Sequence, residues 1–127
     1  MWLSVIAISI GASCGAVLRW VFGLLFNTLP LAIPMGTLLA NLLGGYLIGV
    51  SVEFFSQHAE LSPQWRLLVI TGFLGGLTTF STFSAEVTDM LQKGLLGVAC
   101  ATILVHLVGS LAMTFLGIYT YQISHAS

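Results

Sequence analysis

Four apolar stretches, each long enough to cross a lipid bilayer as a helix, take up nearly all of this 127-residue chain. A bilayer core requires about 20 apolar residues per helix. The stretches run from about residue 2 to 26, 35 to 55, 65 to 91 and 95 to 121, separated by short polar turns. The sequence therefore predicts an all-α membrane protein: one transmembrane domain over residues 1–127 with four transmembrane helices, embedded in lipid.

The charge content supports a membrane setting. Only 6% of the residues are charged, whereas a soluble domain has about 25%. The net charge of -1 gives no indication of nucleic acid as a partner. Cys14 and Cys100 lie in apolar stretches, at a spacing that fits neither a disulfide framework nor a metal site. No basic segment precedes the first apolar stretch, so we expect no cleavable signal peptide.

The basic residues give almost no orientation signal. Arg66 lies at the second loop and Lys93 at the third, which are on opposite sides of the membrane, and Arg19 is near the end of the first helix. Since Lys and Arg in loops normally set topology, either a partner fixes the orientation or the chain inserts both ways. Small-x3-small patterns, such as Gly45 to Gly49, fit packing within one chain or between copies. A bundle of four helices is thin, which favours a homo-oligomer.

The segment from Gly72 to Glu86 is the most polar part of any membrane stretch. Three glycines precede five hydroxyls: Thr78, Thr79, Ser81, Thr82 and Ser84. Lipid does not tolerate unpaired polar groups, so this segment should face protein or a wet cavity. The Gly75-Gly76 pair beside the hydroxyls favours a broken third helix, whose free carbonyls can coordinate a cation. The alternative is a continuous helix in which the hydroxyls bond back to carbonyls one turn earlier.

Other polar and aromatic side chains are candidates for the same path. Phe80 and Phe83 share a helix face, and their positive ring edges favour an anion, although lipid or core contacts explain such a pair equally well. Asn41 can hold helices together or donate its N–H groups to an anion. Arg19 and Glu86 are the deep charges. The last stretch carries a polar stripe, each residue four after the previous one: Thr102, His106, Ser110 and Thr114.

Signals of an enzyme are missing from the sequence. It offers no plausible metal set and no nucleophile–base–acid trio. The glycines of the third stretch lack the strand and the basic residue of a phosphate-binding loop. We therefore expect a protein without enzyme activity.

The motifs resemble those of the Fluc/CrcB family of bacterial fluoride channels. Four segments carry the resemblance, which spans essentially the full length: Gly11–Gly15 followed by Leu18-Arg19-Trp20, Gly36–Gly44 with its G-T-x-x-x-N pattern, Gly72–Glu86, and His106–Thr114. The resemblance implies a dual-topology, antiparallel homodimer in the bacterial inner membrane. It also implies passive, selective export of fluoride from the cytoplasm, and hence fluoride resistance.

The resemblance also implies roles for individual residues. Phe80 and Phe83 would be the pore-lining aromatic pair, and Asn41 a pore amide. The carbonyls of Gly75 and Thr78 would hold a structural Na⁺ on the dimer axis. The other implied residues are polar pore or vestibule lining (Ser81, Thr82, Ser84, His106, Ser110 and Thr114) and a vestibule or structural network (Arg19 and Glu86).

Two other functions are compatible with four small membrane helices. A proton-coupled multidrug exporter usually relies on a carboxylate in its first helix, but here that helix has Arg19 and no acid. A non-transporting assembly subunit would conduct no ions. Phe80→Ile and Phe83→Ile would then leave all measured ion flux unchanged. The polar constellation favours the channel over both.

Overall fold

The computed structural model describes residues 1–126, and these contain helices and no strand. Two long helices come first: α1 (Trp2–Phe26) and α2 (Met35–Ser56). The third span, Pro63–Gln92, is made of four pieces: α3 (Pro63–Arg66), the π-helix η1 (Leu67–Leu74), α4 (Gly75–Leu77) and α5 (Phe80–Gln92). The last helix is α6 (Leu96–Ser124). The four spans are long and apolar enough to cross a membrane, which confirms the predicted all-helical, four-span architecture.

Local sequence explains where the helices end. Asn27 follows α1, and its side-chain carbonyl accepts the N–H of Gly36 at 2.6 Å, so it caps the start of α2 from across the turn. Gly94 follows α5 with a φ of 77°. The N–H of Leu95 donates to the carbonyl of Met90 at 2.9 Å, a Schellman termination that needs the left-handed glycine. The turn to α6 is therefore sharp.

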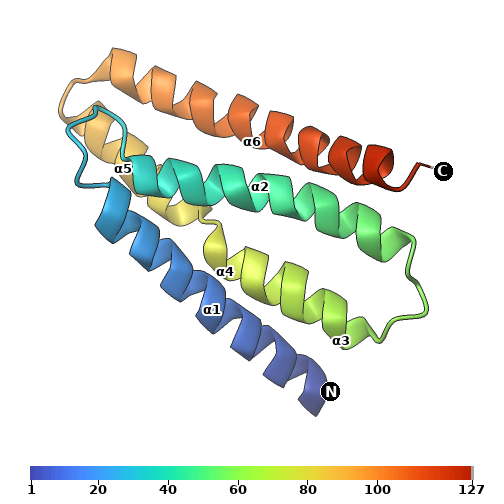
Figure 1. Cartoon of the computed structure of the whole chain (residues 1–127). Helices are drawn as coiled ribbons and strands as arrows, with labels where there is room; N and C mark the ends of the chain where they lie inside the picture. Colours follow the sequence, from blue (N-terminus) through green and yellow to red (C-terminus); the bar gives the residue numbers. More distant parts are fainter. Residues whose placement is uncertain (127) are drawn as a thin grey trace.

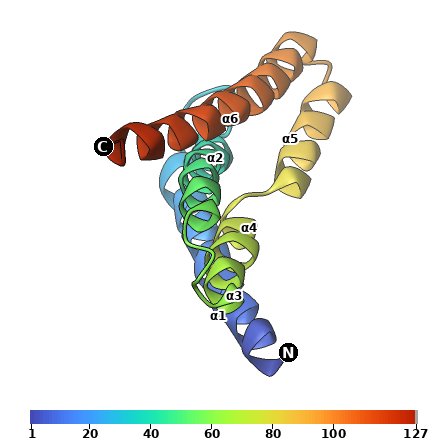
Figure 2. The same ribbon diagram turned by 90° about the vertical axis from the view of Figure 1, so that its right-hand side faces the viewer.

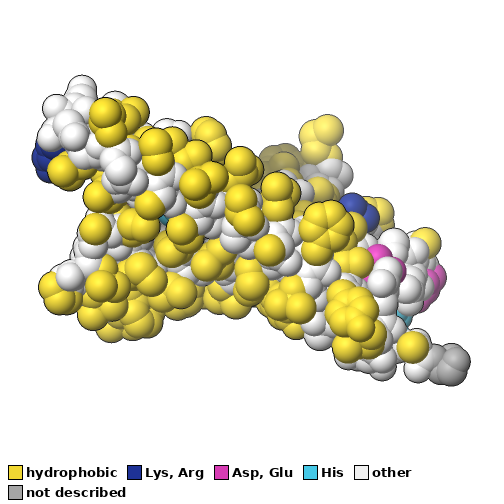
Figure 3. Space-filling model, turned by 90° about the horizontal axis from the view of Figure 1, so that it is seen from above, with side chains coloured by type: hydrophobic (Ala, Val, Ile, Leu, Met, Phe, Trp, Pro, Cys, Tyr) yellow, Lys and Arg dark blue, Asp and Glu magenta, His cyan; other side chains and the backbone are white. Residues whose placement is uncertain are grey.

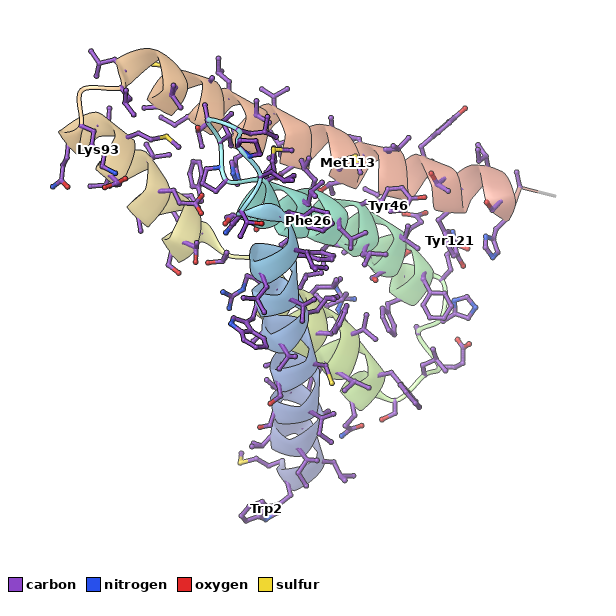
Figure 4. The ribbon with its side chains drawn as sticks, turned by 60° about the vertical axis from the view of Figure 1, so that its left-hand side comes forward. Trp2, Phe26, Tyr46, Lys93, Met113 and Tyr121 are labelled. Atoms are coloured by element: carbon purple, nitrogen blue, oxygen red, sulfur yellow. The ribbon has the colours of Figure 1, made fainter. Side chains whose placement is uncertain are left out.

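The spans pack as two closely apposed pairs, α1 with η1 and α4, and α2 with α6 (Figures 1 and 2). Glycines permit both contacts. A Cβ at Gly15 would collide with the backbone of Phe73, and a Cβ at Gly49 would collide with the carbonyl of Thr114. Tyr46 and Tyr121, labelled in Figure 4, lie where α2 and α6 run side by side. The small-x3-small patterns therefore serve helix packing within one chain.

The third span changes neighbours along its length. Its first part lies beside α1, and a short core of Leu77, Ala40 and Leu74 is buried there. After α4 the chain moves away, and α5 packs against α6 (Figure 2). The change occurs at Thr78 and Thr79, which both have extended backbone.

The outer surface is apolar over most of its area. Figure 3 shows one face covered by hydrophobic side chains, with charged side chains toward its two ends. Large apolar residues such as Leu104, Val108 and Phe115 are exposed along α6. Such a surface is suited to lipid and supports a multi-pass membrane protein.

Replacing Gly49 by alanine should lower the free energy of unfolding by about 1–3 kcal/mol, because the added methyl group overpacks the α2–α6 contact. The measurement is an unfolding titration of the purified protein followed by helical circular dichroism. Gly97→Ala is the matched control, since a Cβ there has no atom within 4 Å. Equal stability of the two variants would contradict this account of the helix contact.

Candidate functional site

A cavity of about 450 Å³ lies where α2, the third span and α6 meet. A largely apolar cavity with a few convergent polar groups is the usual form of a small-ligand site. Each of the three elements contributes polar atoms to it. Its lining consists of Asn41, Gly44, Gly45 and Ile48 from α2; Ile70, Leu74, Gly75, Thr78, Thr79, Phe80 and Phe83 from the third span; and His106, Leu107, Ser110 and Leu111 from α6.

The extended backbone at Thr79 is held by the side chain of Asn41. The N–H of Thr79 donates to Asn41 Oδ1 at 2.7 Å, and Asn41 Nδ2 donates to the carbonyl of Thr79 at 3.1 Å. A backbone N–H can only donate, so the Oδ1 and Nδ2 positions of this amide are fixed. The pair replaces helical hydrogen bonds that the extended residues have given up.

The hydroxyl of Thr79 starts the next helix. Its Oγ1 accepts the N–H of Thr82 at 3.0 Å, the usual contact of a helix N-cap. It also lies 3.1 Å from the hydroxyl oxygens of Ser81 and Thr82. Thr79 is buried, with 9% of its surface exposed. It therefore joins α2 to the first turn of α5, which carries Phe80 and Phe83.

The two phenylalanines lie at the cavity in different surroundings. Their ring centroids are 5.5 Å apart with an interplanar angle of 60°, an edge-to-face arrangement. Phe80 is 78% exposed, whereas Phe83 is half-buried against the ring of His106, with centroids 4.6 Å apart. Both residues are part of the cavity lining.

His106 is the most buried polar side chain of the cavity, at 5% exposure. Its Nδ1 lies 3.2 Å from Asn41 Nδ2. Its Nε2 is buried and has no hydrogen-bond partner among residues 1–126. Buried polar atoms are nearly always paired, so this nitrogen lacks the partner that its burial calls for.

The two deep charges each contact a neighbouring span. Arg19 Nε donates to the carbonyl of Gly76 at 3.1 Å, and within residues 1–126 Arg19 has no acidic partner. The hydroxyl of Thr37 donates to Glu86 Oε2 at 2.6 Å, which ties α2 to α5. The other oxygen of Glu86 is buried without a partner among the residues that the structure describes. Both charges are therefore anchored by single contacts to a neighbouring span.

The polar stripe of α6 divides into cavity-lining and packing residues. Ser110 lines the cavity along with His106. Thr114 donates its hydroxyl to the carbonyl of Ser110 at 2.9 Å, one helical turn earlier. Thr102 is fully buried and donates to the carbonyl of Val98 at 2.8 Å. Only the middle of the stripe is directed to the cavity.

Clusters of metal-binding side chains are missing from residues 1–126, where no three His, Cys, Asp or Glu residues come together. A cation at this site would need backbone oxygens. The donors and acceptors of the cavity instead form a set of neutral groups: hydroxyls, an amide, an imidazole and two phenyl rings.

Comparison with known proteins gives this arrangement a family. A family model described as "CrcB-like protein, Camphor Resistance (CrcB)" matches residues 6–118. The chain is also 65% identical over 127 residues to a protein of Tolumonas auensis, with all of both chains covered. The chain belongs to the CrcB-like family. That relative carries the name fluoride-specific ion channel FluC.

Further relatives of this CrcB-like chain have the same name, fluoride-specific ion channel FluC. One from Chromobacterium violaceum is 60% identical over 122 residues, which cover 96% of this chain and 97% of the relative. Another, from Pseudomonas aeruginosa, is 58% identical over 120 residues and 94% of each chain. The resemblance inferred from the motifs is therefore confirmed along the whole length.

The structure brings many of the predicted site residues of the CrcB-like chain together at one cavity. Those that line it are Asn41, Gly75, Thr78, Phe80, Phe83, His106 and Ser110. Ser81 and Thr82 lie one contact away, on the hydroxyl of Thr79. Six predicted residues are not among its lining: Arg19, Ser81, Thr82, Ser84, Glu86 and Thr114.

Thr79 is the residue whose structural role the sequence analysis missed. In the sequence it is one of five neighbouring hydroxyl residues, and the pattern gives it no role of its own. A threonine three residues before Thr82, directly at the start of the predicted helix with the phenylalanines, fits an N-cap. That signal was available in the sequence, but the pairing with Asn41, 38 residues earlier, was not.

Proposed function

We propose that this chain is a fluoride-selective ion channel, not an enzyme, that lets cytoplasmic fluoride leave passively and so gives fluoride resistance. The observation that carries the proposal is the 65% identity over the full length to a protein named fluoride-specific ion channel. The cavity supports it with chemistry suited to a small anion. Hydroxyls, an imidazole and ring edges offer weak, successive partners, and conduction requires binding loose enough to be reversed.

The decisive experiment is a flux measurement on purified protein in liposomes. We expect rapid efflux of fluoride, read with a fluoride electrode, and little efflux of chloride under the same gradient. Liposomes without protein give the background rate. Equal chloride and fluoride rates would contradict selectivity, and absence of both from well-folded protein would contradict the channel. Proton-coupled efflux of a cationic dye would favour the multidrug exporter instead.

The proposed assembly is an antiparallel, dual-topology homodimer in the bacterial inner membrane. Two features support it. The basic residues are balanced, with Arg66 at one end of the third span and Lys93 at the other. Gly75 lines the cavity and is itself exposed, so the cavity has a side that a second copy can close. Membrane lipid would then cover the apolar faces that remain.

The carbonyls of Gly75 and Thr78 are proposed to hold a structural Na⁺ between the two copies. A continuous helix would direct the N–H of the residue four positions later to each of them. Here the N–H of Thr79 donates to Asn41, and the N–H of Thr82 donates to the hydroxyl of Thr79. Carbonyls released from a helix in this way are suited to alkali cations. When bound, the ion would neutralise the carbonyl dipoles.

Replacing Na⁺ on both sides of the membrane by a large organic cation should reduce fluoride flux, and restoring Na⁺ to the same sample should recover it. Thr78→Pro should also impair flux or assembly, because it removes the N–H that donates to the carbonyl of Leu74 at 3.0 Å. The measurements are fluoride efflux and the dimer fraction in detergent. Full flux and an unchanged dimer without Na⁺ would contradict the site.

A further inference from the structure

Asn41 has all of its amide groups engaged. Its Oδ1 accepts the N–H of Thr79, and one Nδ2 hydrogen is donated to the carbonyl of Thr79. The remaining Nδ2 hydrogen is left for the contact with His106 Nδ1 at 3.2 Å. The orientation of the amide is set by the backbone N–H of Thr79, which cannot accept. Asn41 therefore presents a donor, and not its oxygen, to the imidazole.

A donor at this position fixes the tautomer of the ring. Nδ1 must accept the hydrogen bond, so it carries no proton, and the proton of the neutral ring is on Nε2. Nε2 is buried and has no partner within residues 1–126, and the ring belongs to the cavity lining. Phe83 packs on the same ring at 4.6 Å and limits its rotation. The ring, which is part of the cavity lining, therefore carries an Nε2–H that has no partner within residues 1–126.

We propose that Asn41, held by the backbone of Thr79, fixes His106 in the Nε2–H tautomer, so that the ring offers a neutral donor to the passing anion. His106 makes the contact with the ion, whereas Asn41 and Thr79 are positioning residues. This inference rests on the proposed fluoride channel. Hydrogen bonds between neutral donors and an anion are weaker than those from charged donors, which suits an ion that must leave as well as bind.

The first test reads the tautomer directly. Nitrogen-15 NMR of the labelled protein in lipid nanodiscs distinguishes a protonated from an unprotonated ring nitrogen, and loss of the signal in His106→Gln assigns it. We expect His106 to have an unprotonated Nδ1 and a protonated Nε2. Adding sodium fluoride should shift the Nε2 signal, and the same concentration of sodium chloride should not. A protonated Nδ1, or no response to fluoride, would overturn the inference.

The second test changes the positioning residue. Asn41→Asp replaces the donor that faces Nδ1 by a carboxylate oxygen, which can only accept. Nδ1 of His106 should then become protonated in the nitrogen spectrum. A role of Asn41 confined to helix packing would leave the ring nitrogens as they are. An unchanged spectrum in a folded Asn41→Asp protein would therefore overturn the relay from Thr79 through Asn41.

The third test compares two amides at position 106. The side-chain nitrogen of glutamine reaches about as far as Nε2, whereas that of asparagine reaches only to the level of Nδ1. His106→Gln should therefore carry fluoride about tenfold faster than His106→Asn, the effect of one buried hydrogen bond to an ion. His125→Gln, at an imidazole outside the cavity lining, is the matched control and should match the unaltered protein. Equal flux in the two variants at position 106 would overturn the assignment of Nε2–H.

These outcomes separate the inference from the proposed function. If the unaltered protein carries no fluoride, the channel proposal fails, and the nitrogen spectrum still reports the tautomer. If it carries fluoride with His106 protonated on Nδ1, only the inference fails.

Discussion

Replacing Phe80 and Phe83 together by isoleucine should slow fluoride flux by about tenfold to a hundredfold, with the helical fold retained. Each aromatic contact is worth about 0.5–1.5 kcal/mol beyond its buried area. Loss of both aromatic contacts therefore lowers the rate of fluoride flux by about tenfold to a hundredfold. Isoleucine keeps the apolar volume but has no ring quadrupole. The experiment thus removes the electrostatic feature and preserves most of the packing.

The geometry is the reason to expect that both rings matter. Phe80 is the more exposed of the two and meets Phe83 edge to face, and Phe83 in turn packs on His106. An anion that passes along this row meets positive ring edges before or after the imidazole N–H. Substitution of one ring leaves the other in place, so the double variant should show the larger loss.

The measurement is fluoride efflux from liposomes, with circular dichroism and size-exclusion chromatography to establish folding. Phe115→Ile is the matched control, because Phe115 is 72% exposed on α6, close to the 78% of Phe80, but does not line the cavity. It should leave flux unchanged. Normal flux in the double variant would favour a non-transporting assembly role for this segment.

The sequence predicted the four spans because length and apolar content alone decide them. It also indicated the third span as the functional one, because glycines and hydroxyls at that depth need protein partners. The backbone at Gly75 and Gly76 is helical, and the extended residues are Thr78 and Thr79. Intrinsic propensity indicated the region of the third span that departs from a helix. The tertiary contacts with Asn41 determine which residues there are extended.

Other features depend on contacts that a linear pattern does not contain. The π-helix Leu67–Leu74 has an apolar sequence with nothing to distinguish it from an α-helix. Gly72 of this π-helix packs closely against α1, because a Cβ at that position would lie 2.8 Å from the carbonyl oxygen of Ile8. The regular stripe on α6 suggested four equivalent lining residues. The positions of α2 and α5 decide that Ser110 and His106 line the cavity whereas Thr102 is enclosed.

A population of chains inserted in one orientation should conduct no fluoride, and mixing the two orientations should restore flux. Several lysines added before Met1 should bias insertion one way, because basic residues near short loops are retained on the cytoplasmic side. The same number of lysines added at the loop between α1 and α2 should bias it the other way. Figure 1 shows these two points at opposite ends of the molecule.

The native charges are the reason to expect that so small a change will suffice. Arg66 and Lys93 lie near opposite ends of the third span, and Lys93 is paired with Asp89 at 2.9 Å. Figure 4 likewise places Trp2, at the start of α1, and Lys93 at opposite ends of the molecule. With only three basic residues in the chain, Arg19, Arg66 and Lys93, a few added lysines should outweigh the native bias.

The control is a tail of the same length made of glutamate, since acidic residues contribute little to orientation. That variant should conduct as the unaltered protein does, which separates topology from the bulk of the added segment. Orientation is read from the accessibility of a C-terminal reporter on intact cells, and activity from fluoride efflux. Each lysine variant alone should be inactive, and co-expression of the two should recover efflux, because only then can antiparallel pairs form. Undiminished efflux from a population shown to have one orientation would exclude the antiparallel dimer, whatever the ion selectivity of the cavity.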